Sequence, residues 1–441
     1  MKKTLALILS LCMILALFVG CSEGTPSATT PKPDGNTPNP PATTPKPDGK
    51  AEAISLKVWV PEEEMELTHQ LCDAFNAAHP EWDISFDISI TGIDESVNSL
   101  ETDPELAADV MQVPSGSIAQ IVNEGLVLPI TYDIDNVSKL YGEGAMNSTA
   151  ATTDVGTFYY ALPFSPNSYF MYYNKDLYTE EEVKSLETMM AKDLGEGFYN
   201  FSTDMTNSWY IESFFFAAGC TLFGDDGTDP TQCTFNSADG LAATKYIIDL
   251  VNNPKYVETG DGVEGALFLE GKLGAFTSGT WAMQKDDPVN GMAAVMGDKL
   301  GAVALPTIQI NGKEAHLSNF ADYKTFAVKS STKQPLAAQL LVEFLCNEES
   351  QLARYQAVAA TPTVLSLADN EAVKNDIGTA ALLAQTEFAT AQPNIPQINN
   401  YWTPMQTLGE SIVLRNEVND SNMQATLDKV VADILSTGLG G

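Results

Sequence analysis

One stretch, Ala161–Tyr178 with the sequence ALPFSPNSYFMYYNKDLY, restricts the possible folds more than any other part of the chain. It begins as a short apolar strand, is interrupted by Pro163 and Pro166, and extends again through Tyr169–Tyr173. Each proline fixes φ and removes a backbone donor, so the segment suits a crossing better than the middle of a strand. A second crossing near Ser318–Tyr323 would bring the chain back. The sequence therefore predicts two lobes with a cleft between them.

The first twenty residues have the pattern of an export signal. Two lysines precede the apolar run Thr4–Val19, which is shorter than the roughly 20 residues that a membrane-spanning helix needs. The junction Gly20-Cys21 resembles the lipobox of a bacterial lipoprotein, although Phe18 stands where leucine is usual. We therefore expect residues 1–20 to be removed and Cys21 to be acylated as the new N-terminus. An ordinary cleaved signal followed by a chance cysteine is the alternative.

A polar segment, residues 21–52, separates this signal from the part of the chain that can fold. Thr, Pro, Ser, Gly, Lys and Asp dominate it, and ATTPKPDG occurs at Ala28–Gly35 and again at Ala42–Gly49. Such a composition cannot bury a core, so we expect a disordered or polyproline-like spacer, on the order of 90 Å long when extended. That length suits a lipid anchor beneath a Gram-positive cell wall. A proline-rich ligand of an SH3 domain is the competing interpretation.

Length and charge limit the classes of partner. About 390 residues follow the spacer, too many for one core and enough for two lobes. The formal charge of −35, from 58 acidic and 23 basic residues, argues against binding to nucleic acid or to anionic lipid. An acidic surface instead fits an extracellular protein with a neutral or cationic ligand.

Four cysteines remain after the signal and Cys21 are set aside. Cys72 and Cys346 lie on apolar helical faces and are expected to be small core residues. Cys220 and Cys233 flank a turn-rich segment and either form a disulfide or stay free; the sequence does not distinguish the two. No CxxC or His/Cys spacing indicates a metal site.

Strands and helices alternate in the first part of the folded region, which predicts an α/β fold with a mainly parallel sheet. The expected strands are Ile54–Val60, Ile84–Ile90 and Asp109–Val113, with helices from Glu62 to Pro80 and over Ile118–Glu124. Further on, the pattern predicts helices near Glu180–Met190, Trp209–Ala218, Ser237–Val251, Val263–Glu270, Pro335–Val358, Leu408–Leu414 and Met423–Leu435, and strands at Leu273–Thr277 and Gly301–Pro306. The return segment Ser318–Lys329 is expected to re-enter the first lobe.

The crossings divide these elements between two lobes. We expect an N-terminal lobe of residues 53–165 plus 320–360 and a C-terminal lobe of residues 166–319 plus 361–441.

Motifs spread over nearly all of residues 53–437 carry a family resemblance. They are LKVWV, AADVMQV with GLVLPIT, ALPFSPNSYFMYYNKDLY, FFFAAGCTLF, GALFLEGKLGAFTSGTWAM, LPTI with FADYKTFAVKSST, and QPNIPQINNYW. In this the chain resembles extracellular solute-binding proteins of family 1, of the maltose/maltodextrin-binding kind. The resemblance implies a type II fold of two α/β lobes, a three-segment hinge, and delivery of sugar to the permease of an ABC importer. No G-x-x-x-x-G-K-[ST] motif occurs, so a separate ATPase is expected.

The same resemblance implies a set of aromatic ligand contacts. Trp281 and Trp402 stand where the family places two platforms for sugar rings, and both are expected in loops framed by Gly, Pro or Asn. Tyr210 stands at a third aromatic position, with Trp209 beside it. Aromatic rings bind the apolar C–H faces of sugars, while carboxylates, amides and hydroxyls bind their hydroxyl rims. Core packing is the alternative interpretation of each tryptophan.

Polar contacts are implied at fewer positions. Glu63, with Glu64 as its neighbour, lies at a strand-to-helix turn where the family has a charged pair; charge at a helix end is the alternative. Asn167 replaces a carboxylate of the family, and Tyr169 could add an aromatic edge. The family's tryptophan and Asp-Arg pair after DVMQV have no counterpart, since Val113, Gly116 and Ser117 stand there.

These observations predict a monomeric, cell-surface lipoprotein that captures malto-oligosaccharides, without cofactor or metal. Isomalto-, raffinose-type or β-linked oligosaccharides are alternatives, as is a cell-wall starch-adhesion protein that takes no part in transport. A glycoside hydrolase would need two suitably spaced carboxylates, and no motif marks such a pair. The three histidines, His69, His79 and His316, lie outside the motifs. We therefore expect no enzymatic activity.

Overall fold

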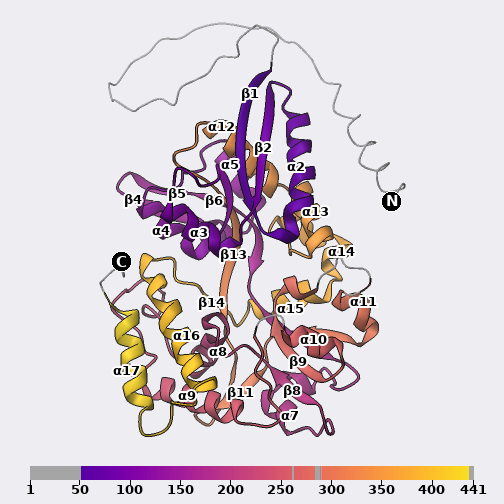
Figure 1. Ribbon diagram of the computed structural model, residues 1–441, viewed down its shortest axis with the longest axis vertical. Helices are drawn as coiled ribbons and strands as arrows, with labels where there is room; N and C mark the ends of the chain where they lie inside the picture. The colour runs from indigo at the N-terminus through magenta and orange to yellow at the C-terminus, as the bar shows by residue number, and fades with distance from the viewer. Residues whose placement is uncertain (1–50, 261–262, 284–288, 290, 437–441) are drawn as a thin grey trace, which may run out of the picture. The chain divides into compact units, whose positions relative to one another are not determined.

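The computed structural model describes residues 51–436 except 261–262, 284–288 and 290 (Figure 1). By its internal contacts the chain separates into residues 1–50 and residues 51–441. The predicted signal, the acylated Cys21 and nearly all of the spacer therefore lie outside the described residues. The first strand already begins at Glu52, so the folded region starts slightly before the predicted end of the spacer.

The first lobe is built on a mixed six-stranded sheet, with the order β14-β13-β3-β1-β2 and β6 paired to β13. Strand β1 is parallel to β2 and β3, whereas β13 runs antiparallel to β3 and β6, so the sheet is less uniformly parallel than predicted. The strands are β1 (Glu52–Val60), β2 (Trp82–Ile90), β3 (Val110–Pro114), β6 (Ala161–Asn167), β13 (Phe320–Val328) and β14 (Thr390–Ala391).

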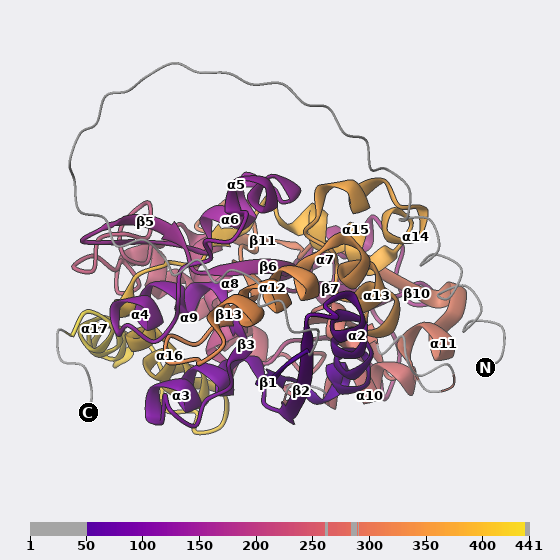
Figure 2. The ribbon, with the colours of Figure 1, turned by 90° about the horizontal axis from the view of Figure 1, so that it is seen from above.

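Helices cover the faces of this sheet (Figures 1 and 2). The apolar spacing in the first helix buries Leu67, Cys72 and Phe75, as expected for an amphipathic helix. The predicted single helix Pro335–Val358 is in fact two helices, because Asn347 ends the first and its side chain caps the second at Ser350. The first-lobe helices are α2 (Met65–Ala78), α3 (Ile93–Thr102), α4 (Ile118–Asn123), α5 (Ile134–Val137), α6 (Glu143–Asn147), α12 (Pro335–Cys346) and α13 (Glu348–Val358), beside the hairpin of β4 (Ala150–Thr153) and β5 (Gly156–Tyr159).

The second lobe has a four-stranded sheet in the order β10-β7-β9-β8 and a separate hairpin. Its strands are β7 (Phe170–Asn174), β8 (Tyr199–Ser202), β9 (Leu273–Ser278), β10 (Leu300–Val303), β11 (Thr307–Ile310) and β12 (Lys313–His316). Its helices are α7 (Leu186–Ala191), α8 (Ser208–Ala218), α9 (Ala238–Val251), α10 (Val263–Leu269), α11 (Met292–Met296), α14 (Glu371–Lys374), α15 (Ile377–Gln385), α16 (Asn399–Val413) and α17 (Met423–Ile434).

The chain crosses between the lobes at the segments predicted from sequence. Strand β6 holds both prolines and, among the described strands, pairs with β13, where a register shift between Lys324 and Thr325 accommodates them. Side chains then tie the crossings together: the Asn319 amide donates to Ser168 Oγ (2.9 Å) and to the Tyr169 carbonyl (2.7 Å). The Gln385 amide donates in turn to Asn319 Oδ1 (2.8 Å). These bonds hold the hinge segments in one register.

Each lobe has its own apolar core. Val58, Phe164 and Leu341 lie in the main first-lobe cluster, which also includes Val364 and Leu367, beyond the predicted lobe boundary at residue 360. The folded region therefore consists of two lobes with separate cores, joined by the crossing segments.

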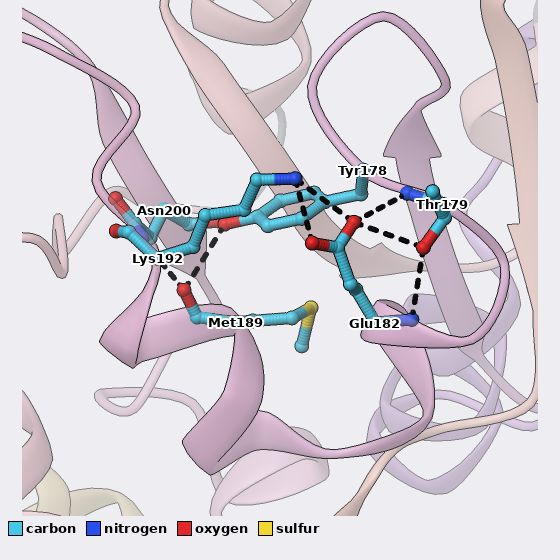
Figure 3. Close-up of polar contacts among 6 residues, drawn as sticks. All are labelled: Tyr178, Thr179, Glu182, Met189, Lys192 and Asn200. Carbon is cyan, nitrogen blue, oxygen red and sulfur yellow. Dashed lines mark hydrogen bonds and ion pairs between the residues drawn. The ribbon is translucent and has the colours of Figure 1, made fainter.

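A polar network fixes the second lobe just beyond β7 (Figure 3). Glu182 accepts from the backbone and the hydroxyl of Thr179 at 2.8 and 2.9 Å and from Lys192 at 2.8 Å. The Lys192 bond is the main reason that the pKa of Glu182 is held at about 2. Tyr178 donates to the carbonyl of Asn200 at 3.2 Å. The turn at Tyr178 and Thr179, which follows β7, is therefore held by Asn200 and by Glu182.

All four cysteines of the folded region are buried free thiols. Cys220 and Cys233 thus do not form a disulfide in this structure, although the strand-like bridge between Leu222 and Cys233 keeps the two segments adjacent. Burial raises the pKa of each of these two thiols to about 12, so both are protonated at neutral pH.

Candidate ligand-binding cleft

A cavity of about 470 Å³ opens where elements of both lobes meet. The first lobe contributes residues of α3, β3, β6, β13 and the turn before α4, and the second contributes residues of α8, the segment after β9, and α16. The lining residues are Ile93, Val97, Asn98, Pro114, Ser117, Asn167, Asn207, Ser208, Trp209, Tyr210, Trp281, Asp322, Lys324, Gln392, Asn399 and Trp402.

Four aromatic residues that the sequence singled out share one wall of this cavity. Trp209 and Tyr210 stand on the first turn of α8, which begins at the cavity because the Asn207 side chain caps the Trp209 amide at 2.9 Å. Trp402 meets Trp209 with ring centroids 6.1 Å apart. Trp402 lies on the first turn of α16 rather than in the predicted loop, and Trp281 lies in a short 3-10 helix.

Trp281 is held between two neighbours. A Cβ placed on Gly279 would lie 1.9 Å from the indole, so the absence of a side chain there lets the ring fold back against the main chain. The ammonium of Lys324 lies 5.6 Å from the centroid of the same indole, within the range of a cation–π contact. Because Lys324 belongs to β13 and Trp281 follows β9, this contact spans the cleft.

The opposite wall is polar and centres on Asp322. Its carboxylate accepts from the Gly116 amide (3.1 Å), the Tyr323 amide (2.6 Å), the Asn167 side chain (3.2 Å) and the Ser115 hydroxyl. Burial raises the pKa of Asp322 to about 6 against the lowering effect of these donors. The side chain is therefore mainly an anion at neutral pH, and Asp322 is among the residues that line the cavity.

Three residues predicted for the site are not among those lining the cavity. Glu63 is exposed on the turn before α2. Glu64 is buried and accepts from Arg354 Nε (2.8 Å) and from the Gln112 amide (2.8 Å), so its carboxylate is used within the first lobe rather than at the cavity. Tyr169 is buried as well, and its hydroxyl lies 3.1 Å from Glu212 Oε1. The aromatic edge expected from Tyr169 therefore does not reach the cavity.

Sequence reasoning missed other residues of the cavity. Asp322 and Lys324 lie in the predicted return segment Ser318–Lys329, where two charged side chains among apolar ones were a local inconsistency that could have marked a site. Gln392 follows a two-residue strand too short to predict. Helix α3, which supplies Val97, was not predicted, although Ile93, Val97 and Leu100 recur at helical spacing and could have marked it.

A second cavity of about 640 Å³ lies wholly in the second lobe. Glu180, Glu181, Glu182 and Glu314 border it, and the His316 and Phe388 rings stack on each other with centroids 3.6 Å apart. It lacks the facing aromatic and polar walls of the interlobe cavity. We therefore take the interlobe cavity as the candidate site.

Another acid, the partly buried Glu258, shapes the pH dependence of the second lobe. Burial raises the pKa of Glu258 to about 8, although Tyr256 donates to it at 2.5 Å and the Met205 amide at 3.0 Å. The folded state thus binds this proton more tightly than the unfolded chain does. Its stabilising effect is complete below about pH 4.5 and is lost as the pH rises through about 8.

We accordingly expect the wild type to be more stable at pH 5 than at pH 8, by on the order of a few kcal/mol. Glu258→Gln keeps the shape of the side chain but cannot ionise, so it should reduce the difference in stability between the two pH values. Urea unfolding midpoints at the two pH values measure both effects. Equal slopes for the wild type and the variant would contradict the burial argument.

Within the described ranges, no helix is long and apolar enough to cross a membrane. The same residues contain no group of three or more His, Cys, Asp or Glu side chains placed to hold a metal ion.

Comparison with known proteins gives a consistent result. A family model described as bacterial extracellular solute-binding protein matches residues 70–381. The galactooligosaccharide-binding protein of Bacillus subtilis (strain 168) is 28% identical over 371 residues, which cover 81% of this chain and 84% of that protein. The maltodextrin-binding protein of the same organism is 28% identical over 323 residues, covering 68% and 72%.

Solved structures agree on the fold. The maltodextrin-binding protein of L. casei BL23, solved without ligand, superposes with a TM-score of 0.74 at 25% identity, covering 87% of this chain and 99% of that one. The two lobes, the hinge crossings and the interlobe cavity are thus those expected for such a protein. The family match spans well over half of the chain, and the chain belongs to the bacterial extracellular solute-binding proteins.

Proposed function

We propose that this protein is the sugar-binding component of an ABC importer and that it captures a neutral oligosaccharide between its lobes. One observation carries the proposal: Trp209, Trp281 and Trp402 of the second lobe line one cavity together with hydrogen-bonding side chains of both lobes. Sugars present apolar C–H faces and hydroxyl rims, which such a lining matches. The charged side chains in the lining are Asp322 and Lys324, whose opposite charges suit a ligand without net charge.

The preferred ligand in this proposal is a malto-oligosaccharide. Support comes from the maltodextrin-binding relative and from the maltodextrin-binding protein of similar fold. A galacto-oligosaccharide is the second candidate, because the relative matched over 371 residues is named for that sugar. The two ligands differ in linkage geometry and in the orientation of a hydroxyl. The polar wall therefore decides between them more than the tryptophans do.

Isothermal calorimetry on the folded region tests the proposal. The sugar panel contains maltotriose, isomaltotriose, cellotriose, β-1,4-galactotriose and raffinose. We expect maltotriose to bind most tightly, with a dissociation constant in the micromolar range, which corresponds to a binding free energy of about −8 kcal/mol. Preference for galactotriose would favour the second candidate. Absence of binding by any member of the panel would contradict the assignment of an oligosaccharide ligand.

Ligand capture should be coupled to closure of the hinge, since only a closed form distinguishes loaded from empty protein for a permease. Small-angle X-ray scattering should show a smaller radius of gyration for the folded region at saturating sugar than in its absence. An unchanged radius at a sugar concentration shown by calorimetry to saturate the site would rule out closure. In this proposal the protein acts as a monomer and performs no catalysis.

Attachment to the cell surface is a separate part of the proposal. The Gly20-Cys21 junction and the following repeat support a lipid anchor with a spacer. Cells expressing the full chain should incorporate labelled palmitate into the wild type and not into Cys21→Ala. Cys72→Ala is a matched control that removes a thiol but leaves the junction intact, and it should be labelled like the wild type. Equal labelling of the Cys21→Ala variant would disprove the anchor.

A further inference from the structure

The carboxylate of Asp322 is placed differently from a carboxylate that serves only to hold the fold. It lies on β13 and borders the cavity, and it meets Asn167 of the facing strand β6 at 3.2 Å. Asn167 stands where the family resemblance implied a carboxylate acceptor. The structure therefore shows an amide at that position and a carboxylate directly across from it.

The two oxygens of Asp322 are used unequally. Oδ1 accepts from Gly116 N, from Tyr323 N and from the Ser115 hydroxyl, which together fix the orientation of the carboxylate. In the part of the chain that the structure describes, Oδ2 accepts from Asn167 alone. A carboxylate oxygen can accept two hydrogen bonds, so Oδ2 has capacity for one more donor.

A second acceptor lies next to it. Gln392 also lines the cavity, and its Oε1 is buried with no hydrogen-bond partner among the described residues. The Gln392 amide lies over Gly116, so close that a Cβ at residue 116 would fall 1.8 Å from Nε2. Since Gly116 also donates to Asp322, the two side chains meet around one glycine. Buried acceptors without donors are unfavourable, and a ligand hydroxyl would satisfy each of them.

We infer that Asp322 is the specificity-determining carboxylate of the first lobe, and that it accepts a hydroxyl of the bound oligosaccharide while Gln392 accepts from a neighbouring one. This inference rests on the proposed function and adds the residues that read the hydroxyl rim. Asn167 positions the carboxylate by donating to the oxygen that faces the ligand. The site thus selects a sugar unit with two adjacent hydroxyl donors and rejects one that lacks either.

The first experiment measures Asp322→Asn by calorimetry with the tightest-binding trisaccharide of the panel. The substitution keeps the shape of the side chain and leaves an oxygen in the position of Oδ1 for its three donors. The new amide group takes the position of Oδ2, and Asn167 can rotate its own amide so that its oxygen accepts from it. We expect affinity to fall about 10- to 100-fold, since bonds to charged groups are the stronger ones, with a near-normal melting temperature.

The second experiment separates ligand contact from fold maintenance. Monodeoxy analogues of the same trisaccharide are titrated into the wild type and into Asp322→Asn. In the wild type, one analogue should bind with an affinity at least about 10-fold lower than that of the parent trisaccharide. In the variant, the same analogue should bind nearly as well as the parent. Glu212→Gln is the control: it alters a buried carboxyl outside the cavity lining, so all analogues should change by the same factor.

Three outcomes overturn parts of the argument. If each analogue loses the same factor in affinity in the wild type and in Asp322→Asn, Asp322 does not contact the sugar and the inference is wrong, although the proposed function stands. If the wild type binds no sugar of the panel, both fall together. Should Asp322→Asn not fold, Asn167→Ala replaces it, because it leaves the three donors to Oδ1 in place. That variant must weaken the same analogue-sensitive contact, and failure to do so also overturns the inference.

Discussion

Trp281→Ala and Trp402→Ala are each expected to weaken oligosaccharide binding roughly tenfold to a hundredfold. Both indoles border the interlobe cavity and pack only partly against the core of the second lobe. Burying a large apolar side chain against a partner contributes about 1.5–3 kcal/mol, and truncation removes that contribution from the complex. Calorimetry gives the dissociation constants, and differential scanning calorimetry gives the melting temperatures.

Trp82→Ala is the matched control for these variants. Trp82 stacks on His79 with centroids 5.3 Å apart and packs against the first-lobe core, away from the cavity. Its truncation should lower the melting temperature and leave the dissociation constant unchanged. If the cavity variants instead lost stability and kept their affinity, Trp281 and Trp402 would be core residues and the sugar proposal would lose its main support.

The largest effect on stability is expected at the buried ion pair of the first lobe. Arg354 is fully buried, donates through Nε to Glu64 (2.8 Å) and through Nη1 to the Leu345 carbonyl (3.0 Å), and lies 4.5 Å from the Phe164 ring centroid. Removing one partner leaves the other as an unpaired buried charge. We expect Glu64→Met or Arg354→Met alone to cost about 3–5 kcal/mol of unfolding free energy.

The double variant Glu64→Met/Arg354→Met should be much closer to the wild type, since it leaves no buried charge and fills much of the same volume. Urea unfolding of the wild type, both single variants and the double variant completes the cycle. Single losses no larger than that of the double variant would show that the pair is not electrostatically coupled. Sugar affinity should be unaffected in variants that fold, because neither residue lines the cavity.

Much of the fold could be predicted because it depends on local periodicity. Strands such as Ile54–Val60 and helices such as Ser237–Val251 have clear alternation or helical spacing, and the structure contains them within one or two residues. The crossing at Ala161–Tyr178 was predicted from two prolines and a run of aromatic residues, and the return crossing at Ser318–Tyr323 came with it. These features need no knowledge of distant contacts.

Apart from Asn167, the polar residues of the site were not predicted, because their positions depend on contacts between remote segments. The role of Glu64 is decided by Arg354, 290 positions later, and nothing in the local EEE sequence shows this partner. Asp322 acquires its surroundings from Ser115, 207 positions earlier, and from Asn167. The aromatic wall was easier, because tryptophans are few and their motifs are distinctive.

Strand β13 has a consequence for the order in which the protein can be made. Its first residue, Phe320, belongs to the core of the second lobe, while Phe326 and Val328 belong to that of the first. The strand also lies between β3 and β6, so the sheet begun by Glu52 has a gap until residue 328 has been synthesised. Neither lobe can close its core on a growing chain during most of translation. The two lobes therefore complete their cores late in synthesis and depend on the same strand to do so.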